Sequence, residues 1–118
     1  MAPAYTLATY KVIPGKEDEF ISAWNGLAKA FSSLPSPPYW GTLIRSKTDR
    51  SVFHSFGPWE KADDVRAMRA SSVAAEAFDA IRRLCVEMTP GDYELVTHIA
   101  VREEPVPATS NPRRSEPD

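Results

Sequence analysis

The stretch Val52–Val65, with the sequence VFHSFGPWEKADDV, decides the fold. Residues 51–56 are rich in β-branched and aromatic side chains, which is typical of a strand. Gly57 and Pro58 interrupt this pattern, and a charged segment with helical spacing of its apolar residues follows from Glu60 to Ala70. The stretch therefore predicts a strand that turns sharply into a helix, with His54 inside the strand and Trp59 at the turn.

The N-terminal part predicts the same succession of strand, turn and helix. Residues 5–13 have the composition of a strand, and Pro14-Gly15 ends it. Residues 17–19 then place three carboxylates in a first helical turn, where they meet the positive end of the helix dipole. The apolar residues of this helix have the spacing of one face, namely Phe20, Ile21, Trp24, Leu27, Ala28 and Phe31.

The remaining segments complete the pattern. Residues 32–38 hold three prolines and three serines and predict a loop, and residues 40–46 predict a strand that forms a hairpin with residues 51–56. Ser71-Ser72 offers an N-cap for a second amphipathic helix that extends to Met88 and ends at Pro90-Gly91. Residues 93–101 predict the last strand.

The order β-α-β-β-α-β predicts an α+β fold of the ferredoxin-like type. We expect a four-stranded antiparallel sheet with the first strand between the third and fourth, and with the helices on one face. Both faces of the sheet carry apolar side chains, in the pairs Leu7 and Tyr10, Leu43 and Ile44, Val52 and Phe53, and Leu95 and Val96. Since helices cover only one face, we predict a homodimer whose sheets meet face to face, a dimeric α+β barrel.

Composition limits the classes of function. The 118 residues are enough for one domain, expected over residues 1–101, and the formal net charge of -2 without a dense basic stripe argues against nucleic acid. No apolar run approaches the ~20 residues of a membrane span, and no secretory signal is visible. The single cysteine, Cys85, fits the reducing cytoplasm. Residues 102–118 hold four prolines and predict a mobile or docked tail, which could cross onto the partner subunit.

Two motifs resemble those of a known family. The first is Tyr10–Phe20, YKVIPGKEDEF, and the second is Val52–Val65, in which a strand runs into Trp-Glu and a helix. With the spacing between them, they resemble the antibiotic biosynthesis monooxygenase family of dimeric α+β barrel proteins, over residues 5–101. The resemblance implies oxidation of an electron-rich aromatic polyketide by molecular oxygen without metal, flavin or haem. Such chemistry needs a base or hydrogen-bond partners, an aromatic cavity and exclusion of water.

Two histidines and one tyrosine are the candidate catalytic residues. His54 lies on the predicted third strand and His98 on the predicted fourth, and an imidazole is a natural general base. Either histidine could instead be exposed or hydrogen-bonded in the dimer interface, because the sequence does not say which face it occupies. Tyr10 could bond a substrate phenol or only a neighbouring side chain.

The candidate walls of the substrate site are aromatic. Trp59 stands at the Trp-Glu motif, where it either closes a pocket or anchors the following helix against the sheet. Trp24 and Phe78 face inward on their predicted helices, so they are core residues, walls, or both. Tyr39 and Trp40 follow the proline-rich loop, which is either a lid or inert.

We expect neither a metal nor another cofactor, because no His or Cys pair has ligand spacing and no cofactor motif is found. Three classes of function stay open on the sequence. The first is a cofactor-independent monooxygenase acting on an aromatic small molecule. The second is a non-catalytic dimeric protein that binds a small ligand. The third is a cyclase or isomerase on the same scaffold.

Overall fold

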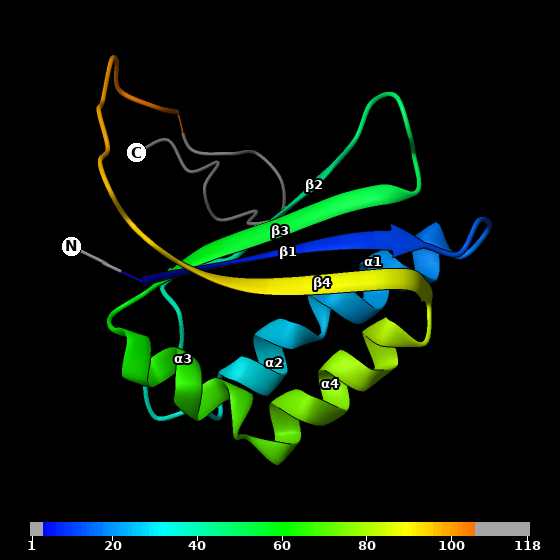
Figure 1. Cartoon of the computed structure of the whole chain (residues 1–118), viewed down its shortest axis with the longest axis horizontal. Coiled ribbons are helices and arrows are strands. Elements are labelled where there is room, and N and C mark those ends of the chain that lie inside the picture. Colours follow the sequence, from blue (N-terminus) through cyan, green and yellow to red (C-terminus); the bar gives the residue numbers. More distant parts are fainter. Residues whose placement is uncertain (1–3, 106–118) are drawn as a thin grey trace, which may run out of the picture.

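The computed structural model describes residues 4–105, which form a four-stranded antiparallel sheet with helices against one face (Figure 1). The elements follow one another as β1 (Ala4–Val12), α1 (Glu17–Asn25), α2 (Leu27–Phe31), β2 (Thr42–Arg45), β3 (Val52–Trp59), α3 (Ala62–Arg69), α4 (Ser72–Arg82) and β4 (Cys85–Glu94). The sheet order is β2-β3-β1-β4. This confirms the ferredoxin-like fold and the position of the first strand between the third and the fourth.

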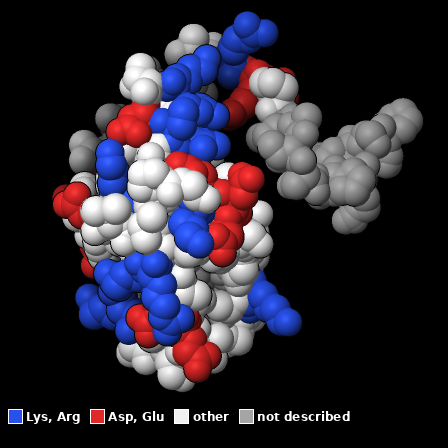
Figure 2. Space-filling view, turned by 90° about the vertical axis from the view of Figure 1, so that its right-hand side faces the viewer, with Lys and Arg blue, Asp and Glu red and all other residues white. Residues whose placement is uncertain are grey.

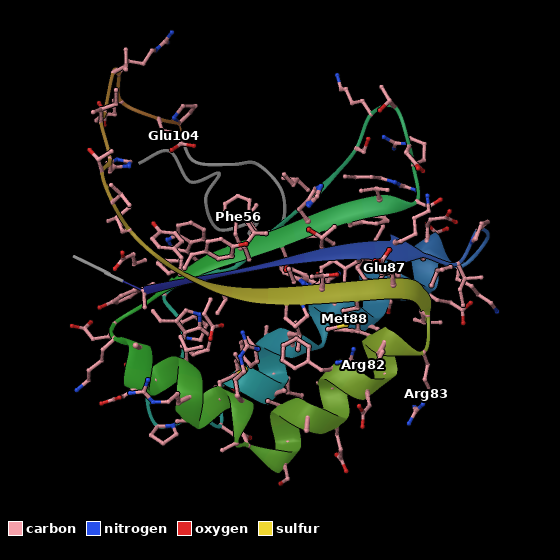
Figure 3. The ribbon with its side chains drawn as sticks, in the orientation of Figure 1. Phe56, Arg82, Arg83, Glu87, Met88 and Glu104 are labelled. Atoms are coloured by element: carbon pink, nitrogen blue, oxygen red, sulfur yellow. The ribbon has the colours of Figure 1, made fainter. Side chains whose placement is uncertain are left out.

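The register of β1 assigns side chains to the two faces of the sheet. Tyr10 pairs with Phe53 on β3 and with Met88 on β4, and these residues pack with the helices in one core cluster. Because side chains alternate along a strand, Thr9 and its partner His54 lie on the face without helices. Figure 3 shows the same alternation, with Phe56 on the helix-free side of the sheet and Met88 on the helix side.

The expected helix boundaries are confirmed at two starts. Before α1, the backbone N–H of Gly15 donates to Glu17 Oε1 over 2.9 Å. Gly15 itself has a φ of 93°, a backbone conformation that residues with a side chain rarely adopt. Ser71 caps α4, because its hydroxyl accepts a hydrogen bond of 3.2 Å from the N–H of Ala74. The single helix expected from residue 17 to residue 31 is divided into α1 and α2 at Gly26.

The core consists of two clusters that share Phe31 and Phe78. In the first cluster Trp59 packs edge-on against Phe31, with ring centroids 5.7 Å apart. In the second, Phe20 lies between Tyr10 and Phe53, with ring centroids 4.9 and 4.7 Å apart. Both clusters join the helix-side face of the sheet to the helices, so the other face contributes little to the core.

The predicted end of the third strand is wrong. β3 continues through Gly57 and Pro58 to Trp59, and these residues pair with Thr6, Tyr5 and Ala4 of β1. Proline is tolerated here because β2 pairs with β3 only as far as Phe56. The segment beside Pro58 uses only its carbonyl, which accepts a hydrogen bond of 3.1 Å from the N–H of Tyr39. Trp59 is therefore the last residue of the strand and not part of a turn.

The predicted boundary between the last helix and the last strand is also wrong. α4 ends at Arg82, and β4 begins at Cys85, so Cys85 and Met88 are strand residues. Pro90-Gly91 lies within β4, where Pro90 pairs with Ala8. The sheet tolerates this proline because β4 is an edge strand.

The segment predicted as the last strand has another structure. β4 ends at Glu94, and residues 95–105 continue outside the sheet on its helix-free side (Figure 1), where Leu95 is partly buried and residues 96–105 are exposed. Leu95 and Val96, which were expected to lie on the two faces of the sheet, therefore come after its last strand. Of the expected tail, only residues 102–105 are described, and the rest lies outside the described residues.

The described surface carries both signs of charge. At the end of the molecule that faces the viewer in Figure 2, basic and acidic side chains are interspersed, with no continuous basic surface on this face. Within residues 4–105, no helix is both long enough and apolar enough to cross a membrane.

Candidate active site

A cavity of about 390 Å³ lies between the sheet and the helices. Its walls come from β1, β3 and β4, from α1, α2, α3 and α4, and from the segment before β2. Both core clusters contribute, through Trp59 and Tyr10, and Phe31 and Phe78 stand where the clusters meet. The cavity is thus the space that the two clusters leave between them, and most of its lining is apolar.

One wall of the cavity is polar. The hydroxyls of Tyr10 on β1 and Ser55 on β3 share a hydrogen bond of 2.8 Å. Both side chains are buried, because Tyr10 is 1% exposed and Ser55 is 9% exposed. Burial raises the pKa of Tyr10, and the bond to Ser55 offsets part of this effect. Tyr10 therefore remains a neutral phenol at physiological pH and can donate a hydrogen bond.

Trp24 lies beside this pair. Its indole nitrogen Nε1 is buried and has no hydrogen-bond partner among the described residues. Trp24, like Ser55, offsets part of the rise that burial causes in the pKa of Tyr10. Trp24, which the sequence predicted as a wall, is on the cavity lining.

Trp59 combines the two roles that the sequence left open. Its ring lines the cavity and is 1% exposed, and its indole N–H donates to Thr6 Oγ1 over 3.0 Å. The hydrogen bond fixes the ring to β1, and the packing against Phe31 fixes it to α2. Trp59 is thus an anchor between sheet and helices whose face also closes the cavity.

The segment before β2 forms one wall of the cavity. Pro37, Pro38, Tyr39 and Trp40 all line the cavity. The N–H of Tyr39 donates to the carbonyl of Pro58 over 3.1 Å, and its hydroxyl bonds Glu60. This bond to Glu60 raises the pKa of Tyr39. Two attachments therefore hold the segment across the end of β3.

Neither histidine lies on the cavity lining. His54 is on the helix-free face of β3, where its Nδ1 shares a hydrogen bond of 3.0 Å with Thr9 Oγ1. His98 is exposed in the extended segment after β4 and is not on a strand. The sheet therefore separates His54 from Tyr10, the third candidate. His98 lies beyond the last strand, so neither histidine shares the cavity with Tyr10.

Several polar residues of the lining were not predicted from the sequence, among them Ser55 and Arg69. Ser55 follows Phe53 by two residues, so alternation from a buried Phe53 would have placed it on the same face. Arg69, at the end of α3, lines the cavity and pairs with Asp92 of β4. No local pattern predicts this ion pair, because it depends on the position of β4.

Within residues 4–105 no group of three or more His, Cys, Asp or Glu residues could hold a metal ion.

The fold and cavity define a class of small α+β proteins with a pocket between helices and sheet. Comparison with solved structures finds the same fold in a mutant form of SnoaB, a cofactor-independent oxygenase from Streptomyces nogalater, at 19% identity and a TM-score of 0.73. That match covers 87% of this chain and 100% of SnoaB. No family model and no curated protein matches the sequence.

Further structures of this fold are provisionally assigned as antibiotic biosynthesis monooxygenases. One from Bordetella bronchiseptica is 18% identical with a TM-score of 0.71, and the match covers 84% of this chain and 100% of that one. One from Caulobacter crescentus is 21% identical with a TM-score of 0.69, covering 81% and 92%. The chain therefore has the fold of the antibiotic biosynthesis monooxygenases, as its two motifs predicted.

Proposed function

We propose that this protein is a cofactor-independent monooxygenase that acts on an aromatic, polyketide-type small molecule in the cavity between helices and sheet. The observation that carries the proposal is the cavity of about 390 Å³, with aromatic walls and a polar pair, Tyr10 and Ser55, on one side. Sites for small molecules are typically apolar clefts of about 300–1,000 Å³ with a few polar groups. The likeness of fold to SnoaB supports the same class of reaction.

The reaction would convert an activated methylene of the ligand into a carbonyl. The carbon loses two hydrogens and gains one oxygen atom from O₂, and the second oxygen atom leaves as water. The electrons come from the ligand, so an electron-rich ring that stabilises the intermediate carbanion is required. The cavity would contribute by holding the ring between Trp24, Trp59 and Phe78, and by excluding water.

A second function, binding of a small ligand without catalysis, is favoured because the described lining offers no carboxylate or imidazole that could act as a base. The ionisable residues among the described lining are Tyr10, Tyr39 and Arg69. A cyclase or isomerase also needs proton transfer, but it consumes no oxygen. Oxygen uptake therefore separates the first function from the other two.

The test is oxygen uptake by the purified, chelator-treated protein with a panel of anthrones, quinols and naphthols. We expect uptake that survives chelation and falls in Tyr10→Phe. His54→Ala is the matched control, because His54 is on the opposite face of the sheet, and its uptake should equal that of the wild type. Absence of uptake across the panel would refute the monooxygenase proposal and leave the binding function.

We also propose that the partner of this chain is a second copy, bound through the helix-free face of the sheet. This face exposes Leu7, Ile44 and Tyr93 at 36%, 49% and 56%. The segment after β4 leaves the domain on the same side (Figure 1), and its Val96 and Ile99 are 86% and 78% exposed. Apolar surface of this extent is typical of an interface. The same face of a second copy carries the same apolar residues, so the two faces can bury each other. A two-fold axis would place the extended segment of each chain against the other chain.

Sedimentation equilibrium tests the dimer. The wild type should have twice the chain mass, and Leu7→Glu should have the monomer mass because it places a charge in the interface. Val73→Glu is the control, since Val73 is 47% exposed but lies on α4, on the other side of the molecule. A monomeric wild type, or a Leu7→Glu variant that remains dimeric, would contradict the proposal.

A further inference from the structure

We propose that one end of the cavity binds a carboxylate group of the ligand through Arg69 and Thr6. The proposal rests on the proposed function of the cavity as a site for a small aromatic molecule, and it adds the charge of that molecule. Arg69 is the last residue of α3, Thr6 lies on β1, and both line the cavity. Among the described lining residues, Arg69 alone carries a permanent charge, because the tyrosines are neutral phenols at physiological pH.

The register of the sheet brings Thr6 close to Arg69. Thr6 pairs with Asp92 of β4, and opposite residues of an antiparallel pair have Cβ atoms about 4.5–5.5 Å apart on the same face. Arg69 donates from Nη2 to Oδ1 of this same Asp92. The guanidinium and the Thr6 hydroxyl therefore lie on either side of one carboxylate, at the same end of the cavity.

The directions of the hydrogen bonds leave donors free on both side chains. An indole N–H can only donate, so Thr6 Oγ1 accepts in its bond of 3.0 Å with Trp59, and the hydroxyl hydrogen of Thr6 is not used there. None of the described residues accepts from that hydrogen. On Arg69, Nη2 donates to Asp92, whereas Nε and Nη1 have no acceptor within the described part of the chain. A carboxylate, which accepts and does not donate, matches these free donors.

Asp92 positions the guanidinium without occupying the cavity. Asp92 is not on the lining, and its side chain is 62% exposed, compared with 36% for Arg69. The ion pair is therefore held from the solvent side, where water weakens it. A ligand carboxylate can bind the remaining N–H groups of Arg69 while Asp92 keeps its own bond. Asp92 nevertheless repels a second anion, so its charge lowers the affinity for such a ligand.

The residues next to this end of the cavity define the rest of the ligand. The indole of Trp59, which is bonded to Thr6, lines the cavity, and Phe31 packs edge-on against it. A flat aromatic acid can place its ring against Trp59 and its carboxylate at Arg69. The amide of the same acid has nearly the same shape but no charge.

Two ligands, 2-naphthoate and 2-naphthamide, test the proposal by equilibrium dialysis at neutral pH, where naphthoate is ionised. Arg69→Gln should weaken the binding of naphthoate by about three- to tenfold, the range for a charged hydrogen bond at a partly exposed site, and leave naphthamide unchanged. Thr6→Val should also lower the preference for naphthoate, whereas Thr6→Ser, which keeps the hydroxyl, should retain it.

Asp92→Asn separates recognition of the ligand from a purely structural role of the ion pair. This variant should bind naphthoate more tightly than the wild type, because it removes a like charge and keeps a hydrogen-bond acceptor. If the ion pair only held α3 against β4, Arg69→Gln and Asp92→Asn would instead weaken both ligands. Arg66→Gln is the matched control, since Arg66 lies on the same helix and pairs with Asp63 but is not on the lining. Its affinities should equal those of the wild type.

The outcomes distinguish this proposal from the proposed function of the cavity. Unchanged naphthoate binding in Arg69→Gln, equal loss of both ligands, or weaker naphthoate binding in Asp92→Asn would refute the carboxylate site, while binding of naphthamide would still support an aromatic ligand. Binding of neither ligand would overturn both proposals. Neither ligand has an activated methylene, so the result does not depend on oxygenation.

Discussion

Gly57 marks the point where the segment that covers the cavity crosses β3, and its substitution tests the packing there. A Cβ atom on Gly57 would lie 2.3 Å from the backbone oxygen of Trp40, and 3.4 Å from the Cα of Gly41. Since real Cβ atoms hardly ever come closer than 3.0 Å, the two backbones would have to separate by roughly 0.7 Å. Side-chain rotation cannot relieve this overlap, because the obstacle is a backbone carbonyl.

We expect Gly57→Ala to lower the free energy of unfolding by about 1–3 kcal/mol, the usual cost of overpacking. For a domain of this size, that corresponds to a fall in Tm of about 4–12 °C. The displaced segment carries Tyr39 and Trp40, so affinity for an aromatic ligand should fall as well. Thermal unfolding followed by circular dichroism, and dialysis with anthrone, measure the two effects.

Gly41→Ala is the control for this substitution. A Cβ on Gly41 would meet the Trp24 ring at 3.6 Å, which is ordinary van der Waals contact. Gly41→Ala should therefore leave Tm unchanged or raise it slightly, because alanine restricts the unfolded chain. If Gly57→Ala unfolds at the same temperature as Gly41→Ala, the close crossing of the two backbones is not a constraint on this fold and the reasoning fails.

Two further substitutions test a cap and the buried phenol. Ser71→Ala removes the cap of α4 and should cost about 1 kcal/mol in urea unfolding, whereas Ser32→Ala, whose hydroxyl bonds only the Lys29 carbonyl within its own turn, should change little. The raised pKa of Tyr10 stabilises the fold fully below the unfolded value of about 10, and this contribution is lost as pH rises through the higher folded value. Wild-type stability should thus fall more steeply above pH 10 than that of Tyr10→Phe; parallel curves would show that Tyr10 ionises equally in both states.

The sequence was sufficient for the fold because its strongest signals are local. The acidic helix start before Phe20 and the Ser71 cap each depend on a few neighbouring residues. The order of elements then allows few topologies, and the observed sheet order is the expected one.

The predicted boundaries of helices and strands are wrong where a residue fits two patterns. Leu84, Cys85 and Met88 continue the apolar spacing of α4, yet Cys85 and Met88 also fit a strand that lies along β1. Pro58 and Pro90 indicate breaks when read locally. Both are accommodated in strands because β4 is an edge strand and β2 does not extend to Pro58, and these properties appear only after the strands are ordered.

The sequence says more about the apolar lining of the cavity than about its polar contacts. Aromatic residues on apolar faces point inward, and Trp24, Trp59 and Phe78, which the sequence left open as core or wall, are on the lining. The face of a polar strand residue depends on the phase of alternation, which the sequence left open for His54. The burial of Phe53 fixes that phase, and it turns Ser55 toward the cavity and His54 away from it.

The absence of a carboxylate or imidazole among the described lining residues has a kinetic consequence. Tyr10 is a neutral donor because its pKa is raised, and Arg69 is a cation paired with Asp92. In the proposed reaction, the proton that leaves the ligand would therefore pass to water, and the ligand's own acidity would set the fraction that is ionised. We predict that the rate of oxygen uptake rises with pH along the ionisation curve of each substrate. Two anthrones that differ by about one unit in pKa should give profiles displaced by about one pH unit. A common midpoint for both substrates would instead reveal a protein base, and the argument from the lining would be wrong.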